Sequence, residues 1–230
     1  MLAGQAAVPT LVVTDTVNSG ATGIGSGNIL LQTLAGDIAV NTTVSSSAGN
    51  ISLLASGILN LGNLNGGTET PATIRTLADG KTIDLEAGTG AVTMTPSAVL
   101  SSSGNVRVLA VGSITVGQIT AGTAAVSLKT SAGGIFDADG DAGAQNVNVS
   151  AGSLRLDSAT GVGSGSNALE TSVGTLSART SGTGAGIYVN DSDAVTVSSV
   201  ASVSINRVGQ SGGVGSVTDI GGALAGLTTG

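Results

Sequence analysis

The side chains able to carry chemistry in this chain are mostly carboxylates. Its 230 residues include 14 Asp and Glu against 7 Lys and Arg, with no His and no Cys. This composition removes the usual general base, the thiol nucleophile and the imidazole and thiolate ligands of transition metals. Any catalysis would depend on carboxylates, hydroxyl groups and a few scattered cations.

Two carboxylate pairs have a spacing that glycoside hydrolysis could use. Asp84 and Glu86, and likewise Asp191 and Asp193, are separated by one residue, and carboxyl groups held about 5 to 9 Å apart can cleave a glycosidic bond. Sugar sites are normally lined with aromatic rings, whereas this chain has one Phe, one Tyr and no Trp. We interpret both pairs as solvated strand and turn residues and predict no catalytic residue.

The densest acidic feature is Asp137, Asp139 and Asp141 in the segment FDADGDAG. Carboxylates at every second position can converge on Ca²⁺, which takes several oxygen ligands at once. The EF-hand pattern requires Gly and Glu where this chain has Ala142 and Asn148. A calcium site and an ordinary polar turn both stay open; the polar turn is favoured, so we expect no metal and no cofactor.

These side chains would be positioned by a repeat of short apolar pairs. Each pair joins residues i and i+2, which is the periodicity of a strand with one buried face. The first pairs are Ile29/Leu31, Ile51/Leu53, Ile83/Leu85, Val106/Val108, Val126/Leu128, Val147/Val149, Leu176/Ala178 and Val195/Val197. Second pairs follow 7 to 11 residues later, at Ile38/Val40, Leu59/Leu61, Val92/Met94, Ile114/Val116, Ile135/Asp137, Leu154/Leu156, Ile187/Val189 and Val203/Ile205.

A fixed period of this kind marks an array in which neighbouring repeats bury each other. The predicted fold is therefore all-β, a parallel β-solenoid of about nine coils of roughly 21 residues, with three short strands per coil. The third, weaker strand is expected at Val44, Leu64, Leu100 and Ile119. Glycines precede many strands, as tight corners require, and Asn28, Asn50, Asn105 and Asn146 are expected to stack as a partial amide ladder.

The repeat divides the chain into one elongated domain with distinct ends. Residues 1–28 are expected to form an irregular N-terminal coil or lead-in, residues 29–220 the repeats, and residues 221–230 a Gly-rich uncapped tail. Lengthened loops are predicted at 62–80 and 157–173; they are either binding loops or harmless excursions. Because neither end has a capping helix, we expect the unit to stack end to end or to belong to a longer chain.

The pairs also predict which side chains point outward. On the second strand the outward column would place Arg155 between the two aromatic residues, Phe136 and Tyr188. These three residues form the predicted surface contact patch, by stacking or a cation–π contact; the alternative is that the aromatics merely favour strands. On the first strand Asp84 should neighbour Arg107 as an exposed pair of little energetic weight.

Charge and hydropathy limit the partners. A net charge of −7 without a basic cluster argues against nucleic acid and anionic membranes. No apolar run approaches the roughly 18 residues of a membrane-spanning helix, and Met1 is not followed by a signal sequence. We expect no membrane insertion.

Three segments resemble the repeats of filamentous-haemagglutinin-like bacterial surface proteins: GNISLLASGILNLG, AVSLKTSAGGIFDADGDAGAQNVNVSAGSLRL and NALETSVGTLSARTSGTGAGIYVNDSDAVTV. The resemblance covers roughly residues 27–205. It implies a right-handed parallel β-helix in a large secreted adhesin or fibrous surface protein, exported by a two-partner or autotransporter route. The family's N-terminal secretion domain has no match in residues 1–28.

The predicted function is that of an extracellular structural or adhesive protein, a stiff segment of a bacterial surface adhesin or fibre. Its expected partners are a second copy or a continuing chain at its ends, and a host or matrix ligand. The alternative function is a carbohydrate-active β-helix enzyme of the polysaccharide lyase or hydrolase kind.

Overall fold

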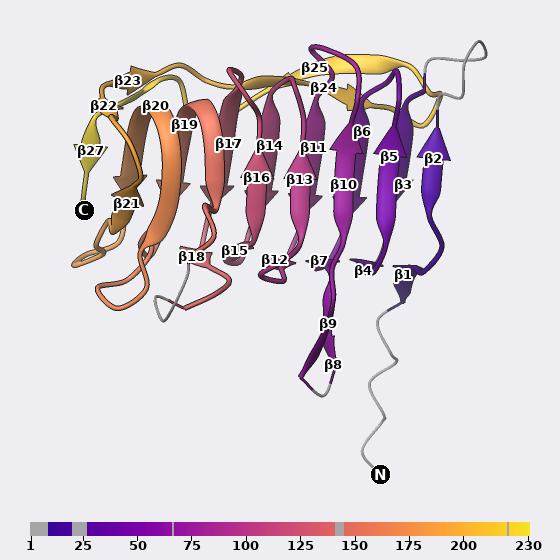
Figure 1. Cartoon of the computed structure of the whole chain (residues 1–230), viewed down its shortest axis with the longest axis horizontal. Helices are drawn as coiled ribbons and strands as arrows, with labels where there is room; N and C mark the ends of the chain where they lie inside the picture. Colours follow the sequence, from indigo (N-terminus) through magenta and orange to yellow (C-terminus); the bar gives the residue numbers. More distant parts are fainter. Residues whose placement is uncertain (1–8, 20–26, 66, 141–144, 220) are drawn as a thin grey trace.

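The computed structural model describes residues 9–19, 27–65, 67–140, 145–219 and 221–230. This part of the chain contains strands and loops but no helix (Figure 1). The strands lie side by side along the long axis of the molecule, and most of them pair in parallel with the strand one turn earlier and one turn later in the chain. The all-β class and the parallel pairing predicted from the sequence are confirmed.

The strands form three ladders, through which the chain passes in turn. Ladder 1 contains β3 (Ile29–Gln32), β6 (Ile51–Ala55), β11 (Ile83–Ala87), β14 (Val106–Ala110) and β17 (Ala125–Thr130). Ladder 2 contains β1 (Thr10–Val13), β4 (Asp37–Val40), β7 (Leu59–Leu61), β12 (Val92–Met94), β15 (Ile114–Val116) and β18 (Ile135–Asp137). Ladder 3 contains β2 (Val17–Ser19), β5 (Thr43–Ser46), β10 (Thr73–Thr76), β13 (Val99–Ser101) and β16 (Gln118–Thr120).

Two long strands join ladders 3 and 1 near the C-terminal end. The first part of β19 (Val149–Ser158) pairs with β16 and its second part with β17, and β20 (Leu169–Thr180) follows β19 along its length. Beyond β20 lie β21 (Val189–Asp191), β22 (Thr196–Val197) and β27 (Leu227–Thr228). Ladder 2 continues there through single bridges from Ile135 to Val162 and from Val162 to Ile187.

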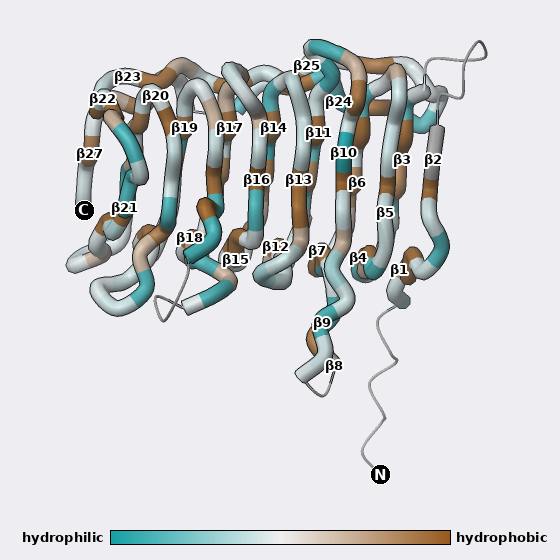
Figure 2. Tube along the Cα trace, viewed as in Figure 1, coloured by the Kyte–Doolittle hydropathy of each residue, from teal (hydrophilic) through white to brown (hydrophobic). Residues whose placement is uncertain are grey.

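The core is a column of aliphatic side chains enclosed by the three ladders. Figure 2 shows hydrophobic positions recurring along the successive strands. Ile51, Ile83 and Val106 follow one another in ladder 1 and are fully buried, as are Leu59, Val92 and Ile114 in ladder 2 and Val44, Ile74 and Leu100 in ladder 3. Because successive turns present side chains of similar size, Val, Ile and Leu fill this narrow interior without aromatic rings.

Glycines make the corner that leads into ladder 2. The N–H groups of Gly57, Gly90 and Gly112 each donate to the carbonyl of the glycine one turn earlier, the first of these being Gly36. Gly36 has φ of +109°, and a Cβ atom there would lie 1.8 Å from the carbonyl oxygen of Pro9. The corner requires glycine both for its backbone conformation and for the close approach of the neighbouring turn.

Register confirms most of the predicted pairs and corrects those near the C-terminal end. Leu154 and Leu156 align with Val126 and Leu128 in ladder 1, not in ladder 2, and Val149 aligns with Ile119 in ladder 3. The extra residues between β18 and β19 displace the repeat. The predicted 157–173 loop contains the end of β19 and the start of β20.

The predicted 62–80 loop contains a hairpin of β8 (Asn63–Asn65) and β9 (Thr68–Thr70) that projects from the stack (Figure 1). Val44, Leu100 and Ile119 occupy ladder 3 as predicted. Leu64 does not: it lies in the hairpin with 61% of its surface exposed, and Ile74 takes the buried position. The hairpin is an insertion, so the strand comes ten residues later than the regular spacing predicts.

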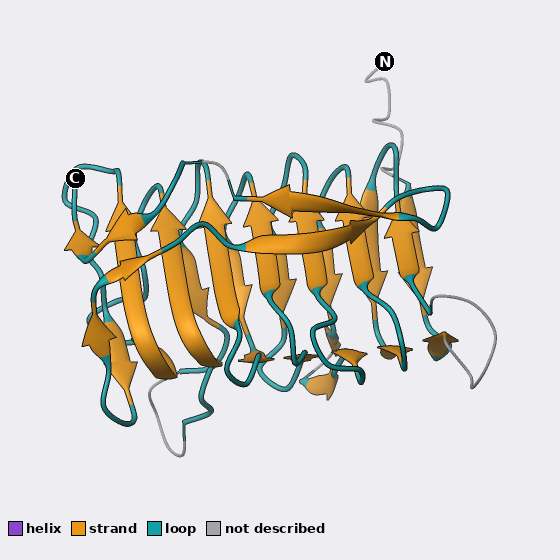
Figure 3. Cartoon of the chain, turned by 90° about the horizontal axis from the view of Figure 1, so that it is seen from above, coloured by secondary structure: helices purple, strands orange, loops and turns teal. Residues whose placement is uncertain are grey.

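The C-terminal part departs most from the predicted repeat. Val203 and Ile205 do not form the predicted second strand of the last repeat, because β24 (Ser204–Val208) and β25 (Val214–Thr218) form an antiparallel hairpin. That hairpin lies across the outer face of ladder 1, as the view in Figure 3 makes clear. β23 (Ser199–Val200) pairs with β26 (Leu224–Ala225). The tail at 221–230, predicted to leave the end uncapped, covers part of it, since β27 pairs with the edge of β20.

Candidate functional site

The C-terminal strap, defined as residues 199–219, covers a charged patch on the outer face of ladder 1. Asp84 and Arg107 are opposite each other on β11 and β14, as predicted. They are not exposed: Asp84 has no accessible surface and Arg107 only 4%. The strap is the reason, because its strand β24 lies over β6, β11 and β14.

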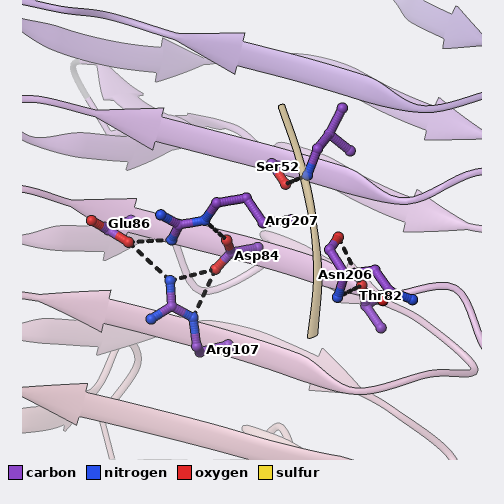
Figure 4. Close-up of polar contacts among 8 residues, drawn as sticks. Ser52, Thr82, Asp84, Glu86, Arg107, Asn206 and Arg207 are labelled. Atoms are coloured by element: carbon purple, nitrogen blue, oxygen red, sulfur yellow. Dashed lines mark hydrogen bonds and ion pairs between the residues drawn. The ribbon is translucent and has the colours of Figure 1, made fainter. Parts of the chain in front are cut away.

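Four side chains form the centre of this contact (Figure 4). Arg107 donates to Asp84 Oδ1 and to Glu86 Oε2, each at 2.9 Å. Arg207 of the strap approaches from the other side, with its Nε 2.6 Å from Asp84 Oδ2 and its Nη2 bonded to Glu86 Oε2. The charges of the two carboxylates and the two guanidinium groups therefore balance in a partly buried contact.

The pKa of Glu86 reflects this environment. Burial alone would raise it, but the hydrogen bonds and charges of Arg207 and Arg107 outweigh that effect and hold the pKa below 4.5. The pKa of Arg207 is raised because Asp84 and Glu86 outweigh the opposing effect of burial. Both shifts favour the charged forms of Glu86 and Arg207.

Polar bonds continue along the strap on both sides of Arg207. The Thr82 hydroxyl donates to the Asn206 carbonyl at 3.2 Å and accepts from the Asn206 N–H at 2.9 Å. The Val208 N–H donates to Ser52 Oγ at 2.9 Å. Asn28 and Asn105, two members of the predicted amide ladder, donate side-chain N–H groups to strap carbonyls of Gly212 and Ser204. The strap therefore replaces water along the outer face of four successive turns.

The amide ladder itself is present in part. The Asn28 side-chain oxygen accepts from the N–H of Asn50, and the Asn50 oxygen accepts from the N–H of Thr82. Asn146 is not a member: it is exposed and donates to Asp139 Oδ2. The insertion between β18 and β19 again explains the difference.

A second charge cluster lies further along ladder 1. Asp157 accepts from Lys129 at 3.0 Å and from both Nε and Nη2 of Arg179. Burial would raise the pKa of Asp157, but these cations lower it overall. Arg155 lies beside them, fully buried, with its Nη2 donating to the Gly222 carbonyl of the tail at 3.1 Å.

The predicted contact patch is therefore wrong in its central residue. Arg155 belongs to ladder 1, where it pairs with Ser127 and Ser177, and the tail covers it. Phe136 and Tyr188 do lie in the same ladder, because their neighbours Ile135 and Ile187 both bridge to Val162. Their side chains are 38% and 46% exposed. Each ring folds over the glycine two residues before it: a Cβ on Gly134 or Gly186 would lie 2.3 or 2.4 Å from the ring. The repeated Gly-Ile-aromatic spacing was the signal for this arrangement.

The two carboxylate pairs weighed for glycoside hydrolysis were interpreted as solvated residues, which is wrong for Asp84 because it is fully buried. Asp84 and Glu86 bind the two arginines described above. Asp191 Oδ2 accepts from Thr171 Oγ1 at 2.7 Å and from the Val173 N–H at 3.2 Å, while Asp193 accepts from Ser172. Both pairs thus serve contacts between strands.

The acidic turn after β18 holds a buried carboxylate. Asp137 is 6% exposed; its Oδ1 accepts from Asn148 Nδ2 at 2.6 Å and from the Asp139 N–H at 3.2 Å. Burial and the neighbouring Asp139 raise the pKa of Asp137 to about 7. Asp141 lies outside the described residues. Within the described ranges no group of three or more Asp or Glu residues is arranged as a metal site.

The C-terminal end of the stack is open and apolar. A depression of about 340 Å³ is lined by six apolar residues and two carboxylates: Leu176, Ile187, Val189, Val195, Val197, Leu227, Asp191 and Asp193. Val197 and Leu227 are about half exposed. At the other end β1, β2 and β3 each have one edge that no described strand covers. Both ends therefore carry strand edges that no described strand pairs.

Comparison of the chain with protein-family models, with curated proteins and with solved structures finds no significant match. In the part of the chain that the structure describes, no helix is long and apolar enough to cross a membrane.

Proposed function

We propose that this chain is a structural element of an extracellular fibre or adhesin. The stacked turns would form a right-handed parallel β-helix, and the protein would be of the filamentous-haemagglutinin-like kind on a bacterial surface. The three sequence segments quoted above support the family, and the three parallel ladders support the helix. In this role the protein provides length and stiffness, because each turn is held by a row of backbone hydrogen bonds along the axis.

The observation that carries the proposal is the pair of open ends. At the N-terminal end the edge strands are β3 in ladder 1, β1 in ladder 2 and β2 in ladder 3. At the C-terminal end they are β22 and β27 in ladder 1, the Ile187 segment in ladder 2 and β21 in ladder 3. Both sets of strands run in the same sense around the stack. A further turn could therefore pair with either end, contributed by a second copy or by a longer chain. Such a head-to-tail contact does not close on itself and generates a filament.

The exposed apolar groups at the C-terminal end favour the same partner. Val197 and Leu227 would be covered by the first turn of the next copy, where Leu11 and Val12 are also exposed. Burial of such side chains contributes about 25 cal/mol per Å². The projecting β8–β9 hairpin is the natural place for a host or matrix ligand, since it lies outside the stack. Beside it a groove of about 410 Å³ is lined by Ala39, Asn60, Thr93 and Leu64.

An end-specific substitution tests this proposal. Val197→Asp should reduce self-association, because it places a charge in the end contact. Val214→Asp is the matched control, since Val214 is also 49% exposed but lies on the strap. Sedimentation velocity over a concentration series should show growing species for the native chain and the control only. Equal behaviour of all three proteins would refute association through this end.

The enzymatic alternative has less support. The two carboxylate pairs that could act on a sugar are engaged with Arg107 and Arg207, or with Thr171 and Ser172. An acid–base pair needs one carboxyl group of raised pKa, whereas the pKa of Glu86 is lowered. We therefore place the function in the ends and surfaces of the stack.

A further inference from the structure

Two loops far apart in sequence meet beside the acidic turn after β18. Residues 138–140 leave β18, and residues 159–168 connect β19 to β20. The Asn167 side chain joins them, since its Nδ2 donates to the Asp139 carbonyl at 2.7 Å. Asp137 and Asn167 are therefore both hydrogen-bonded to the backbone of Asp139, which places three oxygen-bearing residues at this turn.

Two buried oxygens in this group have no hydrogen-bond donor. Asp137 is 94% buried: its Oδ1 accepts two hydrogen bonds, while its Oδ2 has no partner. The side-chain oxygen of Asn167 is likewise buried without a partner, although its nitrogen is bonded. Buried oxygens of this kind are rare and call for an explanation such as an ion.

The described residues supply no cation to the carboxylates of Asp137 and Asp139. None of the ion pairs within the described residues involves Asp137 or Asp139. Two nearby amide donors are engaged, with Asn148 Nδ2 on Asp137 and Asn146 Nδ2 on Asp139. Burial of a carboxylate next to a second one is costly unless a cation compensates the charge.

We propose that Asp137, Asp139 and Asn167 bind a calcium ion. All the available ligands are oxygens, which are the ligands of hard cations, and Ca²⁺ tolerates the irregular geometry of loop ligands better than Mg²⁺ does. Two carboxylates and one amide oxygen leave further positions for water. The ion would tie the turn after β18 to the loop before β20, at the place where the regular repeat is interrupted.

Calcium titration of the metal-free protein by isothermal calorimetry tests the site. The native chain, dialysed against chelator and then against buffer, should bind one Ca²⁺. Asp139→Asn and Asp137→Asn should each weaken binding at least about tenfold. Asp79→Asn removes an exposed carboxylate from a distant turn and should bind like the native chain. Absence of binding, or equal binding by all four proteins, would overturn the proposal.

Thermal unfolding distinguishes a role of Asp137 as a Ca²⁺ ligand from a purely structural role of this residue. The Asp137→Asn amide retains an oxygen for Asn148 and Asp139 and replaces the unpartnered oxygen. In chelator this variant should be at least as stable as the native chain, and Ca²⁺ should raise the Tm of the native chain alone. If the two carboxylates instead share a proton, the native Tm will not respond to Ca²⁺ and the proposal fails.

Discussion

At the scale of single residues, the strap depends on charges that compensate each other. The strap covers Asp84 and Glu86, and its Arg207 provides the second cation, beside Arg107, that balances these two carboxylates. A buried ion pair gives little net stability relative to apolar packing, but removal of one partner leaves a poorly solvated charge. The arginine therefore acts mainly by fixing where the strap lies.

Arg207→Ala should loosen the strap and lower the free energy of unfolding by about 1–3 kcal/mol, because Asp84 keeps Arg107 as its partner. Urea unfolding followed by circular dichroism measures the loss, and hydrogen exchange should show faster exchange in β24. Arg75→Ala is the control, since Arg75 is exposed and bonds only to Ser45 among the described hydrogen bonds. An equal effect of both substitutions would contradict the role of Arg207.

Acid should release the same contacts. The pKa values of Glu86 and Asp157 are lowered in the folded chain, so their ionised forms contribute stability above about pH 4.5 and 3.8. That contribution is lost as the pH falls through the folded pKa values. The Tm should therefore drop between pH 5 and about pH 3, and the drop should be smaller in Arg207→Ala. A Tm independent of pH over this interval would be the contrary result.

At the scale of elements, the position of a side chain in a ladder decides its contribution. Leu85→Ala should cost about 2–5 kcal/mol, because Leu85 is fully buried between the turns. Leu64→Ala should change the free energy of unfolding by less than about 0.5 kcal/mol, because it is exposed on the projecting hairpin. Chemical denaturation of the two variants compares the same substitution inside and outside the stack. Similar losses would mean that the hairpin belongs to the core.

The sequence predicted the ladders well where the repeat is regular. Ile83, Val106 and Val126 recur at similar spacings, and the structure places them in register as alternation predicts. It failed where residues are inserted: the hairpin displaced Leu64, and the loop after β18 shifted Arg155 into ladder 1. Periodicity contains no information about which insertion is a loop.

The position of the strap could not be predicted from the sequence for a different reason. Val203 and Ile205 alternate like any other apolar pair, yet they pack from outside against a surface that the sequence does not mark as covered. The partnership of Arg207 with Asp84 spans 123 residues, so no local pattern reveals it. The outward position of Asp84 and its contact with Arg107 were predictable, whereas their burial was not.

At the scale of the whole molecule, the proposed function depends on the two ends of the stack. Ladder 2 has six strands and two further bridges, which at about 4.8 Å per turn gives a stack roughly 35–40 Å long. The strap covers part of one side along ladder 1, and the two ends present strand edges that no described strand pairs, with Val197 and Leu227 about half exposed. Natural sheets usually protect such edges, so the open ends are the features most in need of a partner.

Negative-stain electron microscopy of the purified chain over a concentration series tests the central claim most directly. We predict unbranched filaments of constant width whose mean length rises with concentration. Short rods of constant length at every concentration would contradict end-to-end association, and round particles would contradict the stacked fold itself.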